Sequence, residues 1–216
     1  MGGTKRASGR RFDREHGVTT EALMFLGELG TERGEAYAHA THYEPVPVEE
    51  FGLLMRRVPA DAVRGATFVD VGAGMGRAVL LAREYPFKQI VGVELSPHLV
   101  EIARENLARG HGFEVACRDV RLIRADARKR RMPRGDLVVF LYNPFDQEAL
   151  DAVLDRIAER RNASEVWLLY HTPVHGDLVV RRGYETVATL SGAAAYRLSR
   201  PSMNDSMAPT SSACEK

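Results

Sequence analysis

A glycine-rich loop, DVGAGMG at positions 70–76, holds the residues whose types and spacing most strongly indicate a ligand-binding site in this chain. It follows an apolar, β-branched run and precedes a helical pattern. Glycines there permit a tight turn and close approach of a ligand, and amides at the start of the next helix can bind a carboxylate or phosphate. In an open α/β sheet, ligands bind outside the carboxyl ends of the strands. We therefore expect Gly72, Ala73, Gly74 and Gly76 to bind a ligand.

The spacing of these glycines distinguishes two kinds of ligand. The dinucleotide fingerprint G-x-G-x-x-G would place its third glycine at position 77, which is Arg77. Asp70 lies two residues before the first glycine. A buried carboxylate there would repel a pyrophosphate but could accept hydrogen bonds from an ammonium group. The loop therefore favours a zwitterionic amino-acid ligand over a diphosphate.

Acidic residues also end the next two predicted strands. Glu94 ends the second and can accept hydrogen bonds from both hydroxyls of a ribose. Asp126 ends the third, where it can accept a bond from an adenine amino group, although Asp119 is a nearby alternative. We expect Leu95 and Ala127, which follow the two acids, to contact the same ligand. An amino acid, a ribose and an adenine in this order describe S-adenosylmethionine.

Four segments resemble the class I, seven-strand S-adenosylmethionine-dependent methyltransferases: FVDVGAGMGRAVLLA, VGVELSPHLVEIARENL, IRADA and DLVVFLYNPF. The resemblance covers roughly residues 66–199. The chain is also similar to a small bacterial group of unsettled substrate, through its FDREHGV segment and the Tyr-x-Pro element at Tyr43. The resemblance implies an enzyme that uses S-adenosyl-L-methionine as cofactor for methylation. It also implies a sheet of seven strands with the last antiparallel.

The loop after the fourth predicted strand resembles the Asn-Pro-Pro-Tyr/Phe motif of methyltransferases that act on nitrogen. Here it reads Asn143-Pro144-Phe145, with one proline in place of two. Tyr43 either closes over the methionine end of the cofactor, which the resemblance favours, or simply packs in the cap. The resemblance also implies that Asn143 contacts cofactor and target amine and that Pro144 and Phe145 contact the acceptor. A plain strand-ending turn is the alternative, because Asn-Pro is a common turn dipeptide. The favoured acceptor is a protein lysine, then a small-molecule amine, then RNA.

A sheet has to bring these loops together. Seven apolar runs are predicted strands, at 66–72, 89–95, 119–126, 136–142, 165–171, 184–190 and 194–200. Helical patterns occupy 77–85, 98–109 and 147–161. Strands that alternate with helices favour a parallel sheet covered on both faces. We predict an α/β, doubly wound, Rossmann-like fold with a mainly parallel sheet of seven strands, an antiparallel last strand and a helical N-terminal cap.

Four regions are predicted along the chain. They are a basic flexible head, a helical N-terminal cap, the S-adenosylmethionine-binding methyltransferase domain and a flexible tail, at 1–14, 15–65, 66–199 and 200–216. Head and tail hold too few apolar residues to offset the entropy of ordering. In the cap, one helix is predicted from Thr19 or Thr20 to Gly30, and a second from Val48 to Val58.

Composition excludes several classes of protein. Thirty basic and 29 acidic residues leave a net charge of +1, which excludes a general polyanion binder, although 118–134 holds eight basic residues against two acids. Two cysteines, Cys117 and Cys214, cannot form a disulfide framework. No apolar run approaches about 18 residues and no secretory signal is recognisable, so a cytoplasmic protein without a membrane partner is expected. No metal is expected either, because His39 and His42 lack a good third ligand.

Two other functions stay open: a nicotinamide-dependent oxidoreductase and a non-catalytic cofactor-binding module of the same fold. Arg77 at the third glycine position, and the lack of a recognisable Tyr-x-x-x-Lys pair, argue against the first. An intact Asp70, glycine run and Glu94 argue against loss of cofactor binding. His171, at the end of the fifth predicted strand, is expected to be a satisfied core histidine more than a base. No sequence feature indicates the oligomeric state.

Overall fold

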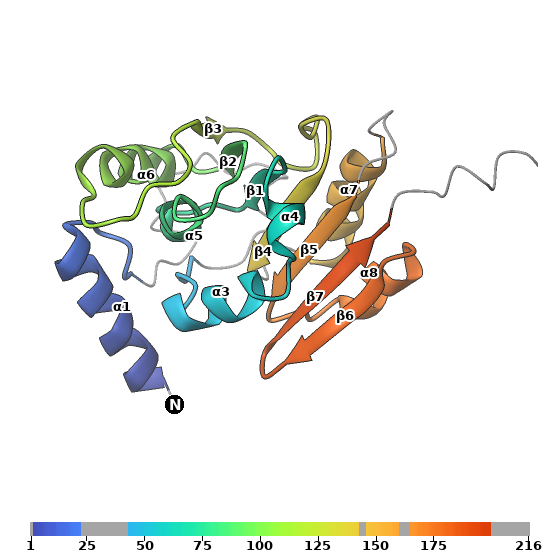
Figure 1. Cartoon of the computed structure of the whole chain (residues 1–216), viewed down its shortest axis with the longest axis horizontal. Coiled ribbons are helices and arrows are strands. Elements are labelled where there is room, and N and C mark those ends of the chain that lie inside the picture. The colour runs from blue at the N-terminus through green and yellow to red at the C-terminus, as the bar shows by residue number, and fades with distance from the viewer. Residues whose placement is uncertain (1, 23–42, 143–145, 160–164, 200–216) are drawn as a thin grey trace, which may run out of the picture.

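The structure, a computed structural model, describes residues 2–22, 43–142, 146–159 and 165–199. Within these ranges the helices are α1 (Gly2–His16), α3 (Val48–Met55), α4 (Ala60–Val63), α5 (Arg77–Ala82), α6 (Pro97–Arg109), α7 (Gln147–Ala158) and α8 (Gly176–Arg181). The strands are β1 (Thr67–Val71), β2 (Gln89–Glu94), β3 (Val120–Arg124), β4 (Leu137–Tyr142), β5 (Val166–His171), β6 (Glu185–Leu190) and β7 (Ala193–Leu198). Figure 1 shows their arrangement.

All seven strands form one sheet in the order β3-β2-β1-β4-β5-β7-β6. Six strands run parallel, and β7 runs antiparallel to both of its neighbours. The predicted α/β, doubly wound sheet with an antiparallel last strand is therefore confirmed. The strand order reverses between β1 and β4, and in such a sheet the ligand crevice opens at the carboxyl ends of the strands beside this reversal.

The strand register aligns the predicted functional residues along one edge of the sheet. Asp70 of β1 is level with Gly92 of β2 and with Phe140 of β4. Tyr142, at the end of β4, is level with His171 at the end of β5. Because parallel strands end at the same edge, loops that are far apart in the sequence meet there.

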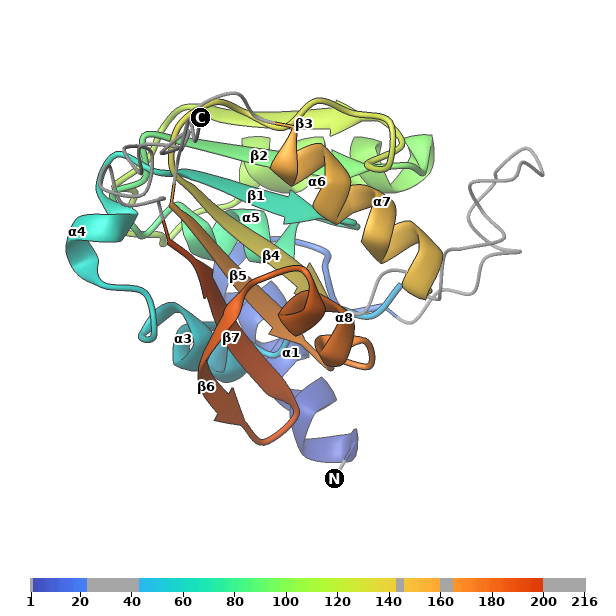
Figure 2. The same cartoon turned by 90° about the vertical axis from the view of Figure 1, so that its right-hand side faces the viewer.

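Helices cover both faces of the sheet (Figure 2). One face packs against α1, α3 and α5 through a cluster that includes Phe51, Phe68 and Phe140, whose rings lie within 5.5–6.4 Å of one another. The other face packs under α7 and α8 around residues such as Val139 and Leu154. Two-sided burial explains why β1 and β4 read as continuous apolar runs instead of alternating ones.

Helix α1 corrects the prediction for the basic head. The composition predicts a flexible segment, but residues 2–14 lie in a helix that continues to His16. The Phe12 side chain anchors it, because this residue is 6% exposed, faces the Arg77 guanidinium at 5.4 Å and lies 5.9 Å from the Phe113 ring. Contacts with distant parts of the chain therefore supply the burial that the local composition lacks.

The cap helices differ in part from their predictions. Helix α3 ends at Met55, three residues earlier than expected, and hydrogen-bonded turns continue to Val58. Residues 21–22, predicted to begin a helix, are not helical, and the rest of that predicted helix lies outside the described residues. Helices α4 and α8 were not predicted. The tail at 200–216 and the end of the helix predicted at 147–161 also lie outside the described residues.

Candidate functional site

The glycine-rich loop joins β1 to α5 at the carboxyl edge of the sheet. Gly72, Gly74 and Gly76 have φ angles of +80°, +53° and +86°, where a residue with a Cβ is strained. The amides of Gly72 and Ala73 donate to the carbonyl oxygen of Val93 at 2.9 and 3.0 Å. The loop is therefore held by its backbone against the end of β2, in a shape that requires alternate glycines.

The third glycine of this loop faces a helix. A Cβ at Gly76 would stand 3.2 Å from the Cβ of Ala103 on α6, so the missing side chain lets α6 pack closely. The Gly76 amide donates to the carbonyl oxygen of Ala73 at 2.8 Å, which closes the turn before α5. Close packing against α6 therefore explains why position 76 is a glycine. A direct contact between Gly76 and the cofactor stays a prediction.

Asp70 is a buried acid near the end of β1. The residue is 3% exposed, and no residue in the described part of the chain forms a hydrogen bond or ion pair with its carboxyl group. Burial, together with the nearby charge of Glu94, raises the pKa of Asp70 to about 8. Buried carboxylates are normally paired. Asp70 is therefore a buried acid without a partner in the described chain, and its binding of a cationic group stays a prediction.

The Glu94 carboxylate links the glycine loop to the start of α6. One oxygen accepts a hydrogen bond from the Gly74 amide at 2.9 Å, and the other accepts one from the Ser96 amide at 2.8 Å. Burial raises the pKa of Glu94, although these bonds and one from the half-buried Leu95 oppose the shift. A carboxylate has lone pairs beyond these bonds. Acceptance of ribose hydroxyls by Glu94 stays a prediction.

Asp126 lies just after β3, at the same edge of the sheet, and is engaged by Arg128. Its oxygens accept bonds from Arg128 Nη2 at 2.9 Å and from the Arg128 amide at 3.0 Å. Partial burial opposes ionisation, but these Arg128 contacts lower the pKa of Asp126 overall. The alternative acid, Asp119, precedes β3 at the opposite edge and accepts a bond from Gln89 at 2.7 Å. Asp126, followed by the buried Ala127, is therefore the candidate at the same edge of the sheet as the glycine loop.

Tyr43 lies directly against the glycine loop. A Cβ at Gly74 would stand 2.2 Å from Cε2 of the Tyr43 ring. The ring packs with Met75 and Leu99, and its hydroxyl donates to the carbonyl oxygen of Thr20 at 2.8 Å. Burial raises the pKa of Tyr43, so the hydroxyl stays protonated and remains a donor. The structure brings Tyr43 to the predicted cofactor loop, and its catalytic role stays a prediction.

The other end of the edge is formed by β4 and β5. The Tyr142 ring lies 4.2 Å from the buried His171 ring, and Nε2 of His171 contacts the Glu50 carboxylate on α3. Nδ1 of His171 lies 3.1 Å from the hydroxyl of Thr172, whose φ of +52° is unusual for a β-branched residue. These contacts agree with a satisfied core histidine. The predicted acceptor residues at 143–145 lie outside the described residues.

Negative charge gathers near the Tyr142 hydroxyl. Burial raises the pKa of Tyr142, and the carboxylates of Glu44 and Glu50 raise it further. Glu44 also forms a side-chain hydrogen bond with Tyr142. Since Glu44 follows Tyr43 directly, one short segment reaches both the glycine loop and the end of β4. This part of the edge favours a cationic group.

Sequence reasoning missed the structural role of three residues around this edge: Arg77, Glu44 and Glu50. Arg77 served only to exclude a dinucleotide, yet it is 2% exposed and contacts the N-terminal segment. The sequence feature that could have revealed this role is an arginine at the start of the otherwise apolar helix RAVLLA. A charged residue in such a helix is expected to be buried, and a buried guanidinium requires polar partners. Glu44 and Glu50 carry no comparable local signal.

Comparison with known proteins finds a match for the part of the chain that forms the carboxyl edge of the sheet. Residues 68–161 match the family model for a methyltransferase domain. The match includes the glycine loop, Glu94 and Asp126, and runs from β1 to α7. Residues 68–161 are therefore similar to a methyltransferase domain.

The chain is also similar to a curated protein over a shorter stretch. Seventy-five residues are 41% identical to release factor glutamine methyltransferase from Geobacter sulfurreducens. This stretch is 34% of the present chain and 24% of that relative, so the match spans about a quarter of the relative's length.

Solved structures confirm the methyltransferase fold. Ribosomal protein L11 methylase from Lactobacillus delbrueckii subsp. bulgaricus is 17% identical, with a TM-score of 0.52 over 70% of this chain and 78% of that one. A proposed RNA methyltransferase from Pyrococcus horikoshii is 15% identical, with a TM-score of 0.53 over 79% of this chain and 91% of that one. At these identities the likeness concerns the fold alone.

The residues of the methyltransferase domain fit the cofactor of its family, S-adenosylmethionine. The Asp70 carboxyl, which has no partner among the described residues, suits the ammonium group of the methionine moiety. Gly92, inside β2, leaves room for the loop, because a Cβ there would meet the Ala73 side chain at 3.1 Å. Glu94 presents a second carboxylate beside the loop. Together these features suit a ligand with a cationic amino-acid end and a hydroxyl-bearing sugar.

Neither a metal cluster nor a membrane-spanning helix is found in the part of the chain that the structure describes. No three His, Cys, Asp or Glu side chains gather there as a metal site requires. None of its helices is both long and apolar enough to cross a bilayer. His39 and His42 lie outside the described residues.

Proposed function

We propose that this protein transfers the methyl group of S-adenosylmethionine to a nitrogen acceptor. The observation that carries the proposal is the Asp70 carboxyl, which is buried without a partner in the described chain, beside a glycine loop at the sheet's reversal point. A cationic amino-acid end would supply the missing partner, and burial makes that charged bond strong. Glu94 on the next strand would accept the ribose hydroxyls.

Each residue in the proposed mechanism contributes to alignment. When bound, S-adenosylmethionine would supply an electrophilic methyl group on its sulfonium sulfur; the methyl carbon would bond to the acceptor nitrogen as the carbon–sulfur bond breaks, leaving S-adenosylhomocysteine. Asp70 and Glu94 fix the two polar parts of the cofactor, and Tyr43 covers the methionine end and excludes water. The Asn143 side chain accepts a bond from the acceptor N–H and aims the nitrogen lone pair. Such alignment contributes roughly 7 to 11 kcal/mol in the best cases.

Two observations support nitrogen as the acceptor atom. The chain is similar over 75 residues to an enzyme named for methylating a glutamine, whose side chain ends in an amide nitrogen, and it carries Asn143-Pro144-Phe145 after β4. The carboxylates of Glu44 and Glu50 beside Tyr142 favour a cationic acceptor. We therefore place a protein lysine first, a small-molecule amine second and RNA third; the exposed arginines of β3 would serve the third.

A protonated amine must lose one proton before it can attack. His171 is engaged by Glu50 and Thr172, so we assign it to structure and not to proton removal. The proton passes to water, and burial of the amine in the crevice promotes its release because a low dielectric disfavours the ammonium form.

Isothermal titration calorimetry tests the cofactor assignment. The protein is titrated separately with S-adenosylmethionine, S-adenosylhomocysteine and NAD. The two sulfur compounds are expected to bind and NAD is not, because Arg77 stands where the dinucleotide fingerprint requires its third glycine. Binding of NAD but of neither sulfur compound would instead indicate an oxidoreductase and overturn the proposal.

Radiolabel transfer tests the acceptor. A cell extract is incubated with methyl-labelled S-adenosylmethionine and the protein, and label is counted in protein, RNA and small-molecule fractions. Label in protein or small amines that survives mild base supports nitrogen, because methyl esters hydrolyse. The Asp70→Asn variant is the matched control and should transfer no label. Cofactor binding without transfer to any fraction would favour a non-catalytic module.

A further inference from the structure

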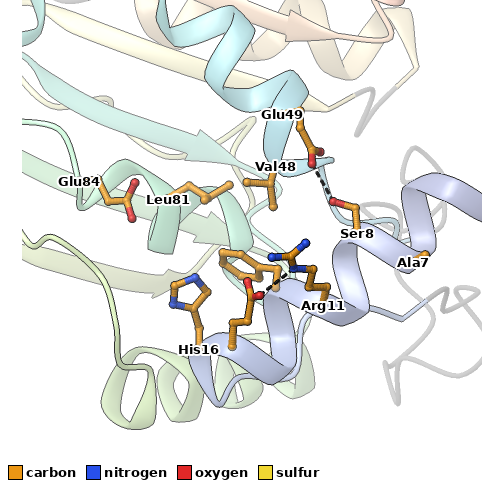
Figure 3. Close-up of a pocket in the computed structure, with 10 residues that line it drawn as sticks. Ala7, Ser8, Arg11, His16, Val48, Glu49, Leu81 and Glu84 are labelled. Atoms are coloured by element: carbon orange, nitrogen blue, oxygen red, sulfur yellow. Dashed lines mark hydrogen bonds and ion pairs between the residues drawn. The ribbon is translucent and has the colours of Figure 1, made fainter.

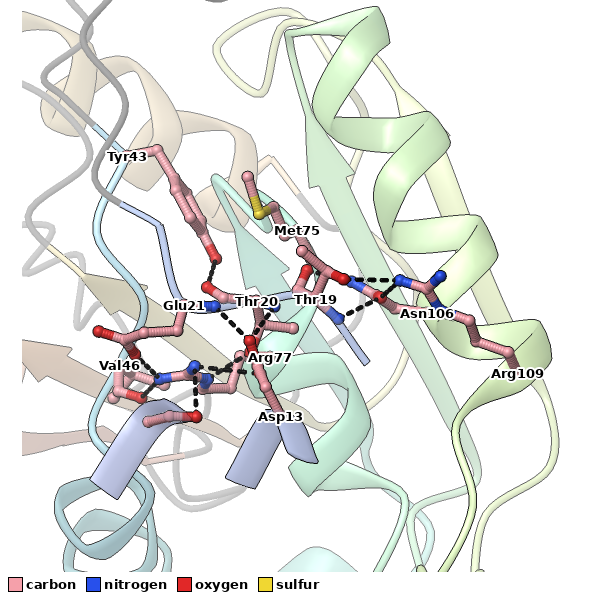
Figure 4. A network of polar contacts seen from close by, with 11 residues as sticks. Asp13, Thr19, Thr20, Glu21, Tyr43, Val46, Met75, Arg77, Asn106 and Arg109 are labelled. Carbon is pink, nitrogen blue, oxygen red and sulfur yellow. Dashed lines mark hydrogen bonds and ion pairs between the residues drawn. The ribbon is translucent and has the colours of Figure 1, made fainter. Parts of the chain in front are cut away.

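The Arg77 guanidinium joins the N-terminal segment to the methyltransferase domain (Figure 4). It is 2% exposed at the start of α5, and its Nε donates to the Thr20 hydroxyl at 2.7 Å. Its terminal nitrogens pair with Glu21 at 3.0 Å and with Asp13 of α1 at 3.4 Å. Removal of a buried partner leaves an uncompensated charge, so these groups depend on one another.

Asp13 organises the chain that follows α1. Its carboxylate accepts bonds from the Thr20 amide at 2.7 Å, from the Thr20 hydroxyl at 2.5 Å and from the Glu21 amide at 2.7 Å. Both Asp13 oxygens are therefore engaged by two consecutive residues, while the carboxylate also pairs with Arg77. The position of Thr20 is fixed from two sides by charge-assisted bonds.

Helix α6 holds the neighbouring residue in the same way. The Asn106 side chain accepts a bond from the Thr19 amide at 2.8 Å and donates to the carbonyl oxygens of Thr19 at 2.8 Å and Met75 at 3.0 Å. Met75 belongs to the glycine loop. The carbonyl of Thr20 is thus presented at a fixed place beside that loop, where it accepts the Tyr43 hydroxyl at 2.8 Å.

A groove runs along one side of α1. The groove, of about 560 Å³, separates part of the helix from α3 and α5, over an apolar floor that includes Phe12, Val48 and Leu81 (Figure 3). Across this groove, the Ser8 hydroxyl donates to Glu49 at 2.9 Å, an exposed bond. The C-terminal half of α1 is seated by Phe12, by the Asp13–Arg77 pair and by His16, whose ring stacks on the Phe113 ring at 4.1 Å.

We propose that Asp13 and Arg77 are positioning residues for the cofactor site. They fix the Thr20 carbonyl, which holds the Tyr43 ring against Gly74 as a wall of the crevice. The inference rests on the proposed function, since it needs a cofactor in that crevice. It adds that α1 must be seated for tight cofactor binding, and that binding in turn stabilises the seated helix, because such coupling is reciprocal.

Calorimetry with S-adenosylhomocysteine on the full chain tests this inference. Asp13→Ala and Tyr43→Phe should each weaken binding by about tenfold, and Asp13→Asn by less, because asparagine keeps an oxygen acceptor. The double variant Asp13→Ala/Tyr43→Phe should be little weaker than either single variant, because both break one chain of contacts. Hydrogen exchange of residues 9–22 should slow on binding in the wild type and not in Tyr43→Phe.

A control on the same helix separates positioning from general damage. Arg11, exposed on α1 and paired with Glu15 at 2.7 Å, is replaced by glutamine, which should leave affinity within about twofold. If Asp13→Ala does not fold, Thr20→Val and Tyr43→Phe carry the test. Unchanged affinity in Tyr43→Phe, or fully additive losses in the double variant, would overturn the positioning role alone. A folded wild type that fails to bind S-adenosylhomocysteine would overturn the proposed function as well.

Discussion

The Tyr43 ring and the backbone of Gly74 lie in direct contact, so closely that a Cβ at Gly74 would stand 2.2 Å from the ring. Glycine is required at position 74 for two reasons. The first is its backbone conformation, with a φ of +53°. The second is the lack of space for a side chain, because Tyr43, 31 positions earlier in the sequence, packs against the loop. The two can be separated by substitution.

Gly74→Ala is expected to abolish measurable S-adenosylhomocysteine binding, because the new methyl group displaces the Tyr43 ring. It should also lower the free energy of unfolding by about 1 to 3 kcal/mol through backbone strain. Gly65→Ala is the matched control, since Gly65 has a φ of +96° with nothing within 4 Å of its would-be Cβ. That variant should lose stability but keep its affinity in calorimetry. Equal affinities in both variants would contradict the Tyr43–Gly74 contact.

Asp70→Asn should stabilise the protein at alkaline pH while it abolishes cofactor binding. The folded-state pKa of Asp70 is about 8, above its ordinary value of 3.8, so wild-type stability falls as pH rises through that window. Asparagine does not titrate, so the variant does not lose the free energy of unfolding that the wild type loses when Asp70 ionises. At pH 8.5 its midpoint of thermal unfolding should exceed that of the wild type by roughly 2 to 4 °C for each kcal/mol of this difference. Asp61→Asn, at an exposed position on α4, should show no such change. Destabilisation of Asp70→Asn at every pH would assign Asp70 a structural role.

Glu94→Ala should weaken S-adenosylhomocysteine binding by about 1 to 3 kcal/mol, through loss of charged hydrogen bonds to the ribose. Stability should fall too, because the amides of Gly74 and Ser96 lose their acceptor. Calorimetry and thermal unfolding separate the two effects. The exposed Glu101 of α6 provides the control, and its replacement by alanine should alter neither quantity. Unchanged affinity in Glu94→Ala would remove Glu94 from the site.

Asn143→Ala should reduce turnover by about 100-fold or more while cofactor affinity stays nearly the same, because its proposed role is alignment of the acceptor. Single-turnover methyl transfer and calorimetry on the same preparation measure the two quantities. Retained turnover would place the acceptor loop elsewhere in the chain.

Glu44→Gln tests the charge of the acceptor. Loss of this exposed carboxylate should raise KM for an amine acceptor by about two- to fivefold, with S-adenosylhomocysteine affinity unchanged, because exposed charges contribute about 1 kcal/mol or less. Steady-state kinetics in low and high salt measure the effect, which should shrink as salt rises. Glu148→Gln on α7 is the control. A lower KM in Glu44→Gln would indicate an anionic acceptor.

The sequence by itself determined the sheet and the residues along its functional edge. Buried parallel strands are continuous apolar runs, and a turn with alternate glycines has a local pattern, so the order of residues is enough to locate β1, the glycine loop and Glu94. Their common edge also follows from sequence, because parallel strands connected by helices end on the same side.

The tertiary structure alone decided how the N-terminal segment joins that edge. Arg77 meets Thr20 and Asp13 across 57 and 64 residues of sequence, and a contact between such distant positions leaves no periodic pattern in either segment. For the same reason composition predicts a flexible segment where α1 forms, since Phe12 is buried against distant residues such as Arg77 of α5 and Phe113 in the loop after α6. Local patterns determine which elements form, whereas distant partners decide which polar groups can be buried.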